Sequence, residues 1–261
     1  MSLALLLSLL PAQPADAEET RRVRVVSVYD GDTLTLDGGD KIRLNHANAP
    51  EIKGDQPYAT QARDLARRLA EGEFVDLTAE GGTDSYGRTV GSIGTSEGDL
   101  ALALIREGYA HVFLIPPVGD TTALVAAQAE ARAARRGIWS TERYQGSLYI
   151  TSFHANGRGD DRAYVNGEYL RVCNVTDAPV DLAGYSVQGS HTQVFPLPSL
   201  VVPPGHTVEI RSGEGVARTD PSSQLVVHLG SDLPLWDDQR EEVTIRDSSG
   251  TLVDRASHPP R

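Results

Sequence analysis

The sequence predicts a mainly β protein with some helix, arranged as a small barrel followed by a β-sandwich. The length of 261 residues suits one large domain or two ordinary ones. The 25 glycines and 15 prolines favour many turns and therefore β structure. The hydrophobic pattern also changes after residue 147, where helical periods stop and short apolar runs take over. These observations together predict two domains of different architecture.

Short strands and helices follow one another in the first half. A helix is predicted over residues 59–69, where five apolar residues share one helical face and Gly72 follows in a cap position. Two more helices are predicted over residues 100–107 and 122–136. Strands are predicted over residues 23–29, 34–36, 41–44, 74–79, 88–93 and 109–114. Three paired strands, a helix, two strands and two helices make a small barrel with helices around it.

The second half contains short β-like runs between Gly, Pro and Asp turns, and it shows no helical period. The runs cover residues 169–175, 185–189, 207–212, 225–229 and 242–247. Several short strands at this spacing predict a β-sandwich.

Residues 1–17 have the pattern of a secretory signal peptide. Residues 3–10 form an apolar run, and Ala15, Asp16 and Ala17 fit a small-x-small cleavage site. The run is too short to span a bilayer, so no stable membrane span is expected. No Lys or Arg precedes the run, which departs from the usual pattern. We expect an exported protein, extracellular or periplasmic, with a cytoplasmic location as the alternative.

Charge and cysteine content limit the possible functions. The formal net charge is −12, and neither half has the basic surplus of a protein that coats nucleic acid. Any chemistry on nucleic acid must therefore depend on a local site and a cation. Cys173 is the only cysteine, so it is predicted to be a buried apolar residue rather than a disulfide or metal ligand. The seven histidines are scattered without a zinc-ligand spacing.

Charged residues cluster at predicted strand ends and loops of the first half. The stretch YDGDT at residues 29–33 is predicted to be a turn in which Gly31 adopts a positive φ, and in which Asp30 and Asp32 end the first strand. Arg43, Glu51, Asp84, Tyr86 and Arg88 complete the set. If these side chains meet at one barrel rim, they suit the hydrolysis of a phosphodiester. Arginine forks neutralise the phosphorane charge, a carboxylate deprotonates water, and oxygen ligands hold a hard divalent cation.

Residues 23–140 resemble staphylococcal nuclease and its thermonuclease-like relatives. The motifs that carry the resemblance occur in order along the chain: YDGDT, IRL…APE, TDSYGR, LIREGYA and GIWS. The resemblance implies an OB-like five-stranded barrel with three helices. It also implies sugar-non-specific, Ca²⁺-dependent cleavage of DNA and RNA that leaves 3′-phosphates.

The resemblance also implies roles for single residues. Arg43 and Arg88 resemble the arginines that stabilise the phosphate, and Glu51 resembles the general base. Asp32 and the backbone carbonyl of Ala49 resemble calcium ligands, with Asp30 in the outer shell. Tyr86, supported by Asp84, is expected at the substrate.

Two positions depart from the pattern of this family. Asn48 stands where the family usually has a second calcium carboxylate, so it is predicted to be a weaker, uncharged ligand. Leu114, Ile115 and Pro116 stand where the staphylococcal enzyme has tyrosines that contact the nucleotide.

Residues 148–257 resemble a lamin tail domain. The matching stretches are EYLRVCNVTDAPVDLAGYSV, VFPLPSLVVPPGHTVEI and LWDDQREEVTIRDSSGTLVD. The resemblance implies an immunoglobulin-like sandwich that binds or tethers an unknown ligand. The predicted domain limits are therefore 18–140 for the nuclease-like domain, 141–147 for a linker and 148–257 for the second domain.

Two other functions remain open from the sequence. The protein can be a non-catalytic nucleic-acid-binding barrel with a weakened calcium site, for which Asn48 is the argument. It can also be a surface scaffold in which the second domain is the active part. A monomer is expected in each case.

Overall fold

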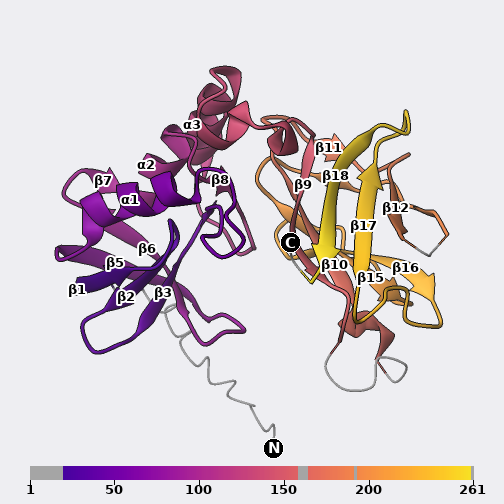
Figure 1. The fold of residues 1–261 in the computed structure, drawn as a ribbon, viewed down its shortest axis with the longest axis horizontal. Helices are drawn as coiled ribbons and strands as arrows, with labels where there is room; N and C mark the ends of the chain where they lie inside the picture. Colours follow the sequence, from indigo (N-terminus) through magenta and orange to yellow (C-terminus); the bar gives the residue numbers. More distant parts are fainter. Residues whose placement is uncertain (1–19, 158–163, 191–192, 260–261) are drawn as a thin grey trace, which may run out of the picture.

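The computed structural model describes residues 20–157, 164–190 and 193–259, and shows a mainly β protein with three α-helices in two domains (Figure 1). The predicted signal peptide lies outside the described residues. The predicted fold class is confirmed: a closed barrel with helices is followed by packed β-sheets. None of the described helices is long and apolar enough to cross a membrane.

The barrel is closed by a parallel contact between strands that are far apart in the sequence. Neighbouring strands pair in the order β3-β2-β1-β5-β6, and the parallel pairing of β3 with β6 joins the two ends. The bounds are β1 Thr20–Val28, β2 Thr33–Leu36, β3 Lys41–Leu44, β5 Phe74–Thr83 and β6 Thr89–Thr95. The two-residue strand β7 (Gly98–Asp99) extends the sheet beyond β6.

Alternating apolar residues fill the barrel. Val25, Leu34, Ile42, Leu77 and Ile93 come from the five barrel strands, and each is fully buried. Because side chains of a strand alternate between its two faces, these apolar positions fix which face of each strand points inward.

Three helices pack around the barrel. Their bounds are α1 Ala59–Ala70, α2 Leu100–Arg106 and α3 Thr122–Ala133. Asp99 caps α2 by accepting a hydrogen bond from the amide of Leu102 at 2.6 Å. The third helix ends three residues earlier than predicted, because the chain turns through Arg135 at φ 51° and Gly137 at φ 54°.

The segment predicted as a strand over residues 109–114 forms only the short strand β8 (His111–Val112). It pairs outside the barrel with the equally short β4 (Ala47–Asn48). Beyond β8 the chain turns to the second domain, where the amide of Leu114 donates to the carbonyl of Gly205 at 2.8 Å. The prediction of a longer strand here was wrong because this apolar run packs between the two domains.

The second domain is a β-sandwich, as predicted. One sheet has the order β16-β15-β10-β9 and the other β13-β12-β17-β18, with β11 and β14 forming a separate pair. The bounds are β9 Leu148–His154, β10 Tyr169–Asn174, β11 Val180–Asp181, β12 Ser186–Gly189, β13 Phe195–Pro196, β14 Val201–Val202, β15 Thr207–Gly213, β16 Leu225–Ser231, β17 Glu241–Arg246 and β18 Leu252–His258. The short 3₁₀-helix η3 (Val165–Gly167) precedes β10. Trp236 is buried in the core between the sheets.

A buried contact joins the two domains. Gln128 and Arg132 of α3 both donate to the carbonyl of Val175, at 3.3 and 2.7 Å. The segment predicted as a linker contains the 3₁₀-helix η2 (Glu142–Tyr144), which follows η1 (Gly137–Ser140). Its Tyr144 is buried and stacks on Tyr149 with ring centroids 4.4 Å apart. The connection is therefore packed structure rather than an extended tether.

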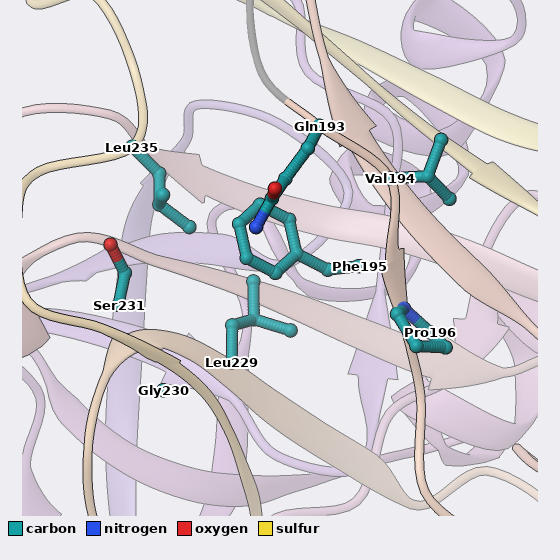
Figure 2. Close-up of a pocket in the computed structure, with 8 residues that line it drawn as sticks. All are labelled: Gln193, Val194, Phe195, Pro196, Leu229, Gly230, Ser231 and Leu235. Atoms are coloured by element: carbon teal, nitrogen blue, oxygen red, sulfur yellow. The ribbon is translucent and has the colours of Figure 1, made fainter.

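A hollow of about 420 Å³ lies at one edge of the sandwich (Figure 2). Phe195, Leu229 and Leu235 are among its lining residues, none of which has an ionisable side chain. The residues that line this hollow therefore offer no acid or base for catalysis.

Candidate active site

The YDGDT stretch forms a tight bend that brings two acids to the barrel rim. The amide of Tyr29 donates to the carbonyl of Thr33 at 2.9 Å and closes the bend. A Cβ at Gly31 would lie 2.6 Å from the Cβ of Ala49 and 2.8 Å from the Cβ of Ala62. Gly31 does not have the positive φ that we predicted. Glycine is required here by close packing against the next loop and α1, not by backbone conformation.

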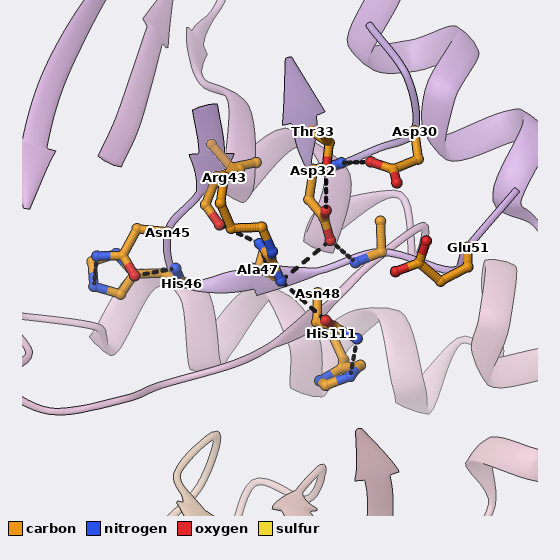
Figure 3. Close-up of polar contacts among 12 residues, drawn as sticks. Asp30, Asp32, Thr33, Arg43, Asn45, His46, Ala47, Asn48, Glu51 and His111 are labelled. Carbon is orange, nitrogen blue, oxygen red and sulfur yellow. Dashed lines mark hydrogen bonds and ion pairs between the residues drawn. The ribbon is translucent and has the colours of Figure 1, made fainter. Parts of the chain in front are cut away.

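Asp32 is buried at the centre of the site (Figure 3). Its Oδ2 accepts a hydrogen bond from the amide of Ala49 at 2.7 Å and lies 3.4 Å from Nη2 of Arg43. The amide of Asp32 itself donates to Oδ1 of Asp30 at 3.1 Å. The bend thus fixes both carboxylates against the loop that carries Asn48, Ala49 and Glu51.

Arg43 lies on β3 and links Asp32 to Asn48. Its Nη2 donates to Oδ1 of Asn48 at 3.0 Å, and its Nη1 donates to the carbonyls of Ala47, at 2.7 Å, and of Leu44. The guanidinium also lies 5.8 Å from the ring centroid of Phe113. These contacts hold the guanidinium fork at the rim of the barrel.

His111, which no sequence motif indicated, holds the other end of the Asn48 amide. His111 is fully buried, and its Nδ1 lies 2.8 Å from the carbonyl of Val112. A carbonyl only accepts, so Nδ1 carries the proton and Nε2 accepts from Nδ2 of Asn48 at 3.2 Å. Burial lowers the pKa of His111 to about 4, so the ring is neutral at pH 7. The Asn48 oxygen is thereby directed to Arg43.

The second domain packs directly behind His111. The ring of Tyr149 meets the imidazole edge to face with centroids 5.3 Å apart, and Tyr144 lies 6.1 Å away. Cys173, buried as predicted, has its sulfur 3.3 Å from the Val112 carbonyl. Because these partners lie far from His111 in the sequence, no local motif could have indicated the contact.

Arg88 reaches the same rim through Thr33, the residue that pairs with Arg43 across β2 and β3. The Asp84 carboxylate accepts a hydrogen bond from Nε of Arg88 at 2.7 Å. Nη1 of Arg88 donates to the hydroxyl of Thr33, next to Asp32, at 3.0 Å. Burial acts to raise the pKa of Asp84, but hydrogen bonds from Arg88 and from the Tyr86 amide outweigh it and lower the pKa. Tyr86 is 77% exposed, with the Arg88 guanidinium 5.3 Å from its ring centroid. Asp84 therefore positions the arginine, and Tyr86 presents its ring to solvent.

Glu51 follows β4 and lies beside this charged cluster. Partial desolvation and the Asp32 carboxylate raise its pKa, while Arg43 and Arg88 both act to lower it. Asp30 is 3% exposed, and burial, followed by the charges of Asp32 and Glu51, raises its pKa to about 7. The carboxylates of Asp30, Asp32 and Glu51 and the guanidinium groups of Arg43 and Arg88 therefore influence one another electrostatically at this rim.

The structure brings together every residue that the sequence analysis assigned to the site. The members are Asp30, Asp32, Arg43, Asn48, Ala49, Glu51, Asp84, Tyr86 and Arg88. Their carboxylate, amide and carbonyl oxygens are the donors that suit a hard cation such as Ca²⁺. Within residues 20–157, 164–190 and 193–259, no group of three or more His, Cys, Asp or Glu side chains is arranged to hold a metal ion. Any Ca²⁺ site here therefore relies on Asn48 and a backbone carbonyl as well as on carboxylates.

The closed barrel and its charged rim place the first domain in the class of OB-like, nuclease-type folds. Residues 41–141 match the family described as Staphylococcal nuclease homologue, and residues 141–259 match the Lamin Tail Domain family. The chain therefore contains a staphylococcal nuclease-like domain followed by a lamin tail domain.

Several curated proteins are similar to this chain. Endonuclease YhcR of Bacillus subtilis is 34% identical over 155 residues, which are 51% of this chain and 13% of that protein. An uncharacterized endonuclease of Haemophilus influenzae is 29% identical over 139 residues, 52% of this chain and 75% of that protein. Staphylococcal nuclease domain-containing protein 1 of Schizosaccharomyces pombe is 33% identical over 105 residues, 37% of this chain and 12% of that protein. The chain thus spans only a small part of the first and third relatives.

Proposed function

We propose that this protein is an exported, Ca²⁺-dependent nuclease that hydrolyses phosphodiester bonds of DNA, RNA or both. The observation that carries the proposal is that Arg43 lies 3.4 Å from the Asp32 carboxylate and Arg88 donates to the adjacent Thr33 hydroxyl, at the rim where Glu51 also lies. The names of the Bacillus and Haemophilus relatives support nuclease activity.

Glu51 is the general base in this proposal. Its carboxylate takes a proton from water, and the water oxygen forms a new bond to phosphorus. The bond from phosphorus to the 5′ oxygen breaks, that oxygen takes up a proton from solvent, and a 3′-phosphate remains. A pKa above the usual glutamate value makes the carboxylate a stronger base, and the charges of Arg43 and Arg88 oppose the rise and favour its ionised form.

Arg43 and Arg88 stabilise the charge that develops on the phosphoryl oxygens. Arginine presents a rigid fork that matches a phosphate, and the carbonyls of Leu44 and Ala47 and the carboxylate of Asp84 hold the two forks in place. Preorganised donors of this kind need no rearrangement as the charge develops.

Asp32, the carbonyl of Ala49 and the amide oxygen of Asn48 would hold Ca²⁺, with Asp30 in the outer shell. When bound, the cation would neutralise the phosphate and increase the acidity of water. Burial and the nearby Asp32 charge both raise the pKa of Asp30 and of Glu51, as expected for a carboxylate cluster that favours a cation.

A non-catalytic nucleic-acid-binding barrel is the second candidate, and Asn48 favours it because an amide brings no charge to the metal. To separate the two, the protein is incubated with end-labelled single-stranded DNA and RNA in Ca²⁺, in Mg²⁺ and in chelator. We expect Ca²⁺-dependent fragments with 3′-phosphate ends. Binding without cleavage at any Ca²⁺ concentration would favour the second candidate.

A further inference from the structure

The two faces of the β9–β10–β15–β16 sheet differ in chemistry. Leu170, Val172, Val208 and Ile210 point into the sandwich core. Because side chains alternate along a strand, the opposite face carries the residues between them. These are Tyr169, Arg171 and Cys173 from β10, paired in register with Arg211, Glu209 and Thr207 from β15. We call this set the outer face.

One end of the outer face is fixed against the first domain. The Cys173 sulfur lies 3.3 Å from the carbonyl of Val112, and the Thr207 hydroxyl donates to the carbonyl of Leu114 at 3.3 Å. Val112 belongs to β8, which pairs with the strand that carries Asn48. The outer face therefore begins directly behind the candidate active site.

The other end of the outer face is cationic and aromatic. Arg171 and Arg211 both pair with Glu209, so two cations share one carboxylate. Tyr169 stacks on His154 with ring centroids 4.3 Å apart and an interplanar angle of 19°, and the Arg171 guanidinium lies 5.7 Å from the Tyr169 ring. This local positive charge stands out in a chain of net charge −12.

Tyr86 of the candidate active site and Tyr169 of the outer face interact electrostatically across the two domains. Burial raises the pKa of Tyr169 and Arg171 opposes the rise, but Glu209 and the phenol of Tyr86 add to it. The two tyrosines, one from each domain, are thus within electrostatic reach of each other. Figure 1 draws the turn between β5 and β6, which carries Tyr86, on the side of the barrel that faces the second domain.

We propose that the outer face is a binding subsite for the single-stranded part of a nucleic acid substrate, next to the phosphate that is cut. An unpaired base extends the stack that Tyr169 forms with His154, and Arg171 and Arg211 contact flanking phosphates. The inference rests on the proposed function. It gives the lamin tail domain a role in holding the substrate rather than only in tethering the enzyme.

The chemistry favours a single strand over a duplex. An aromatic ring can stack only on a base that is not already stacked in a helix, and this gives affinity without sequence preference. Duplex binding depends on many phosphate contacts, which an acidic protein with two arginines at this face does not provide.

The test compares long and short substrates. We would measure kcat/KM for an oligonucleotide of about 20 nucleotides, longer than the usual site of one binding fold, and for a dinucleotide. Tyr169→Leu is expected to lower the ratio of the oligonucleotide value to the dinucleotide value by about fivefold or more. A change of about fivefold corresponds to the weakest stacking energy expected for one base on an aromatic ring. The triple variant R171Q/E209Q/R211Q, which removes the arginines without leaving Glu209 unpaired, is expected to lower it too. Arg246→Gln, an exposed arginine on the other sheet, is the control and should leave the ratio unchanged.

A binding measurement makes this test independent of cleavage. Fluorescence anisotropy with labelled oligo-dT is carried out in the Glu51→Gln background over a series of salt concentrations. Removing the two arginines should reduce the slope of log affinity against log salt by about 0.7 for each phosphate that the protein no longer neutralises. If the wild-type protein binds but does not cut, and binding depends on Tyr169, the subsite stands and the nuclease proposal fails. If cleavage is normal and neither the ratio nor binding responds to these variants, the subsite proposal is overturned.

Discussion

Asn48 shows how one residue at this site is matched to its neighbours. The sequence predicts that Asn48→Asp lowers the Ca²⁺ concentration needed for half-maximal cleavage, because a carboxylate adds charge to the metal site. The structure adds that the new carboxylate would face Nε2 of His111, which is itself an acceptor. We therefore expect a loss of about 1–3 kcal/mol in the free energy of unfolding at pH 7 without Ca²⁺. An unchanged Ca²⁺ requirement in the cleavage assay would contradict the predicted role of residue 48.

Asp30 is the residue whose charge the fold accommodates least well. Its folded pKa of about 7 lies above the ordinary aspartate value of 3.8, so the folded state binds the extra proton between these values and stability falls as the pH rises through 7. Asp30→Asn removes this loss. In chelator, the variant should match the wild-type protein near pH 4 and exceed its free energy of unfolding by up to ~4 kcal/mol at pH 8. Urea denaturation at both pH values measures the difference. A constant difference across pH would show that Asp30 does not titrate as described.

Among the elements, β4 and β8 are the shortest strands that carry site residues, and their pairing transmits packing from the second domain to Asn48. His111→Leu leaves the Asn48 amide without its acceptor, so its oxygen is no longer held toward Arg43. We expect a higher Ca²⁺ requirement for cleavage and a stability loss of about 1–3 kcal/mol. His111→Gln keeps an acceptor and should recover part of the Ca²⁺ response. If the two variants need the same Ca²⁺ concentration for cleavage, the hydrogen bond from Asn48 to residue 111 does not influence the Ca²⁺ requirement, and His111 contributes only to packing.

At the scale of the whole molecule, Gly205 tests whether the domain contact matters for the site. Gly205 has φ 72°, and a Cβ there would lie 2.5 Å from Cγ1 of Val112. Gly205→Ala should therefore displace β8 and raise the Ca²⁺ requirement, with a stability cost of about 1–3 kcal/mol. Gly250→Ala is the matched control, because it has φ 81° and open space around it. Equal effects of both variants on the Ca²⁺ requirement would mean that backbone strain, not the domain contact, is responsible.

Sequence patterns predicted what depends on local periodicity and spaced motifs. The barrel strands, the start of each helix, the sandwich, and the grouping of Asp32, Arg43, Glu51 and Arg88 at one rim all agree with the structure. What they missed depends on tertiary proximity. His111 meets Asn48 across 63 residues, and the packed connection at Tyr144 exists only because two domains meet there. For the same reason the close packing that requires glycine at position 31 was mistaken for a turn requirement.

The most direct test of the proposed mechanism is the rate of single-stranded DNA cleavage by Glu51→Gln in saturating Ca²⁺. Loss of the general base should lower kcat by about 10²–10⁴-fold while the thermal unfolding midpoint stays near that of the wild-type protein. Glu107→Gln, an exposed glutamate at the end of α2, is the control and should cut at the wild-type rate. Cleavage by Glu51→Gln within tenfold of the wild-type rate would contradict the assignment of Glu51 as the general base and with it the proposed mechanism.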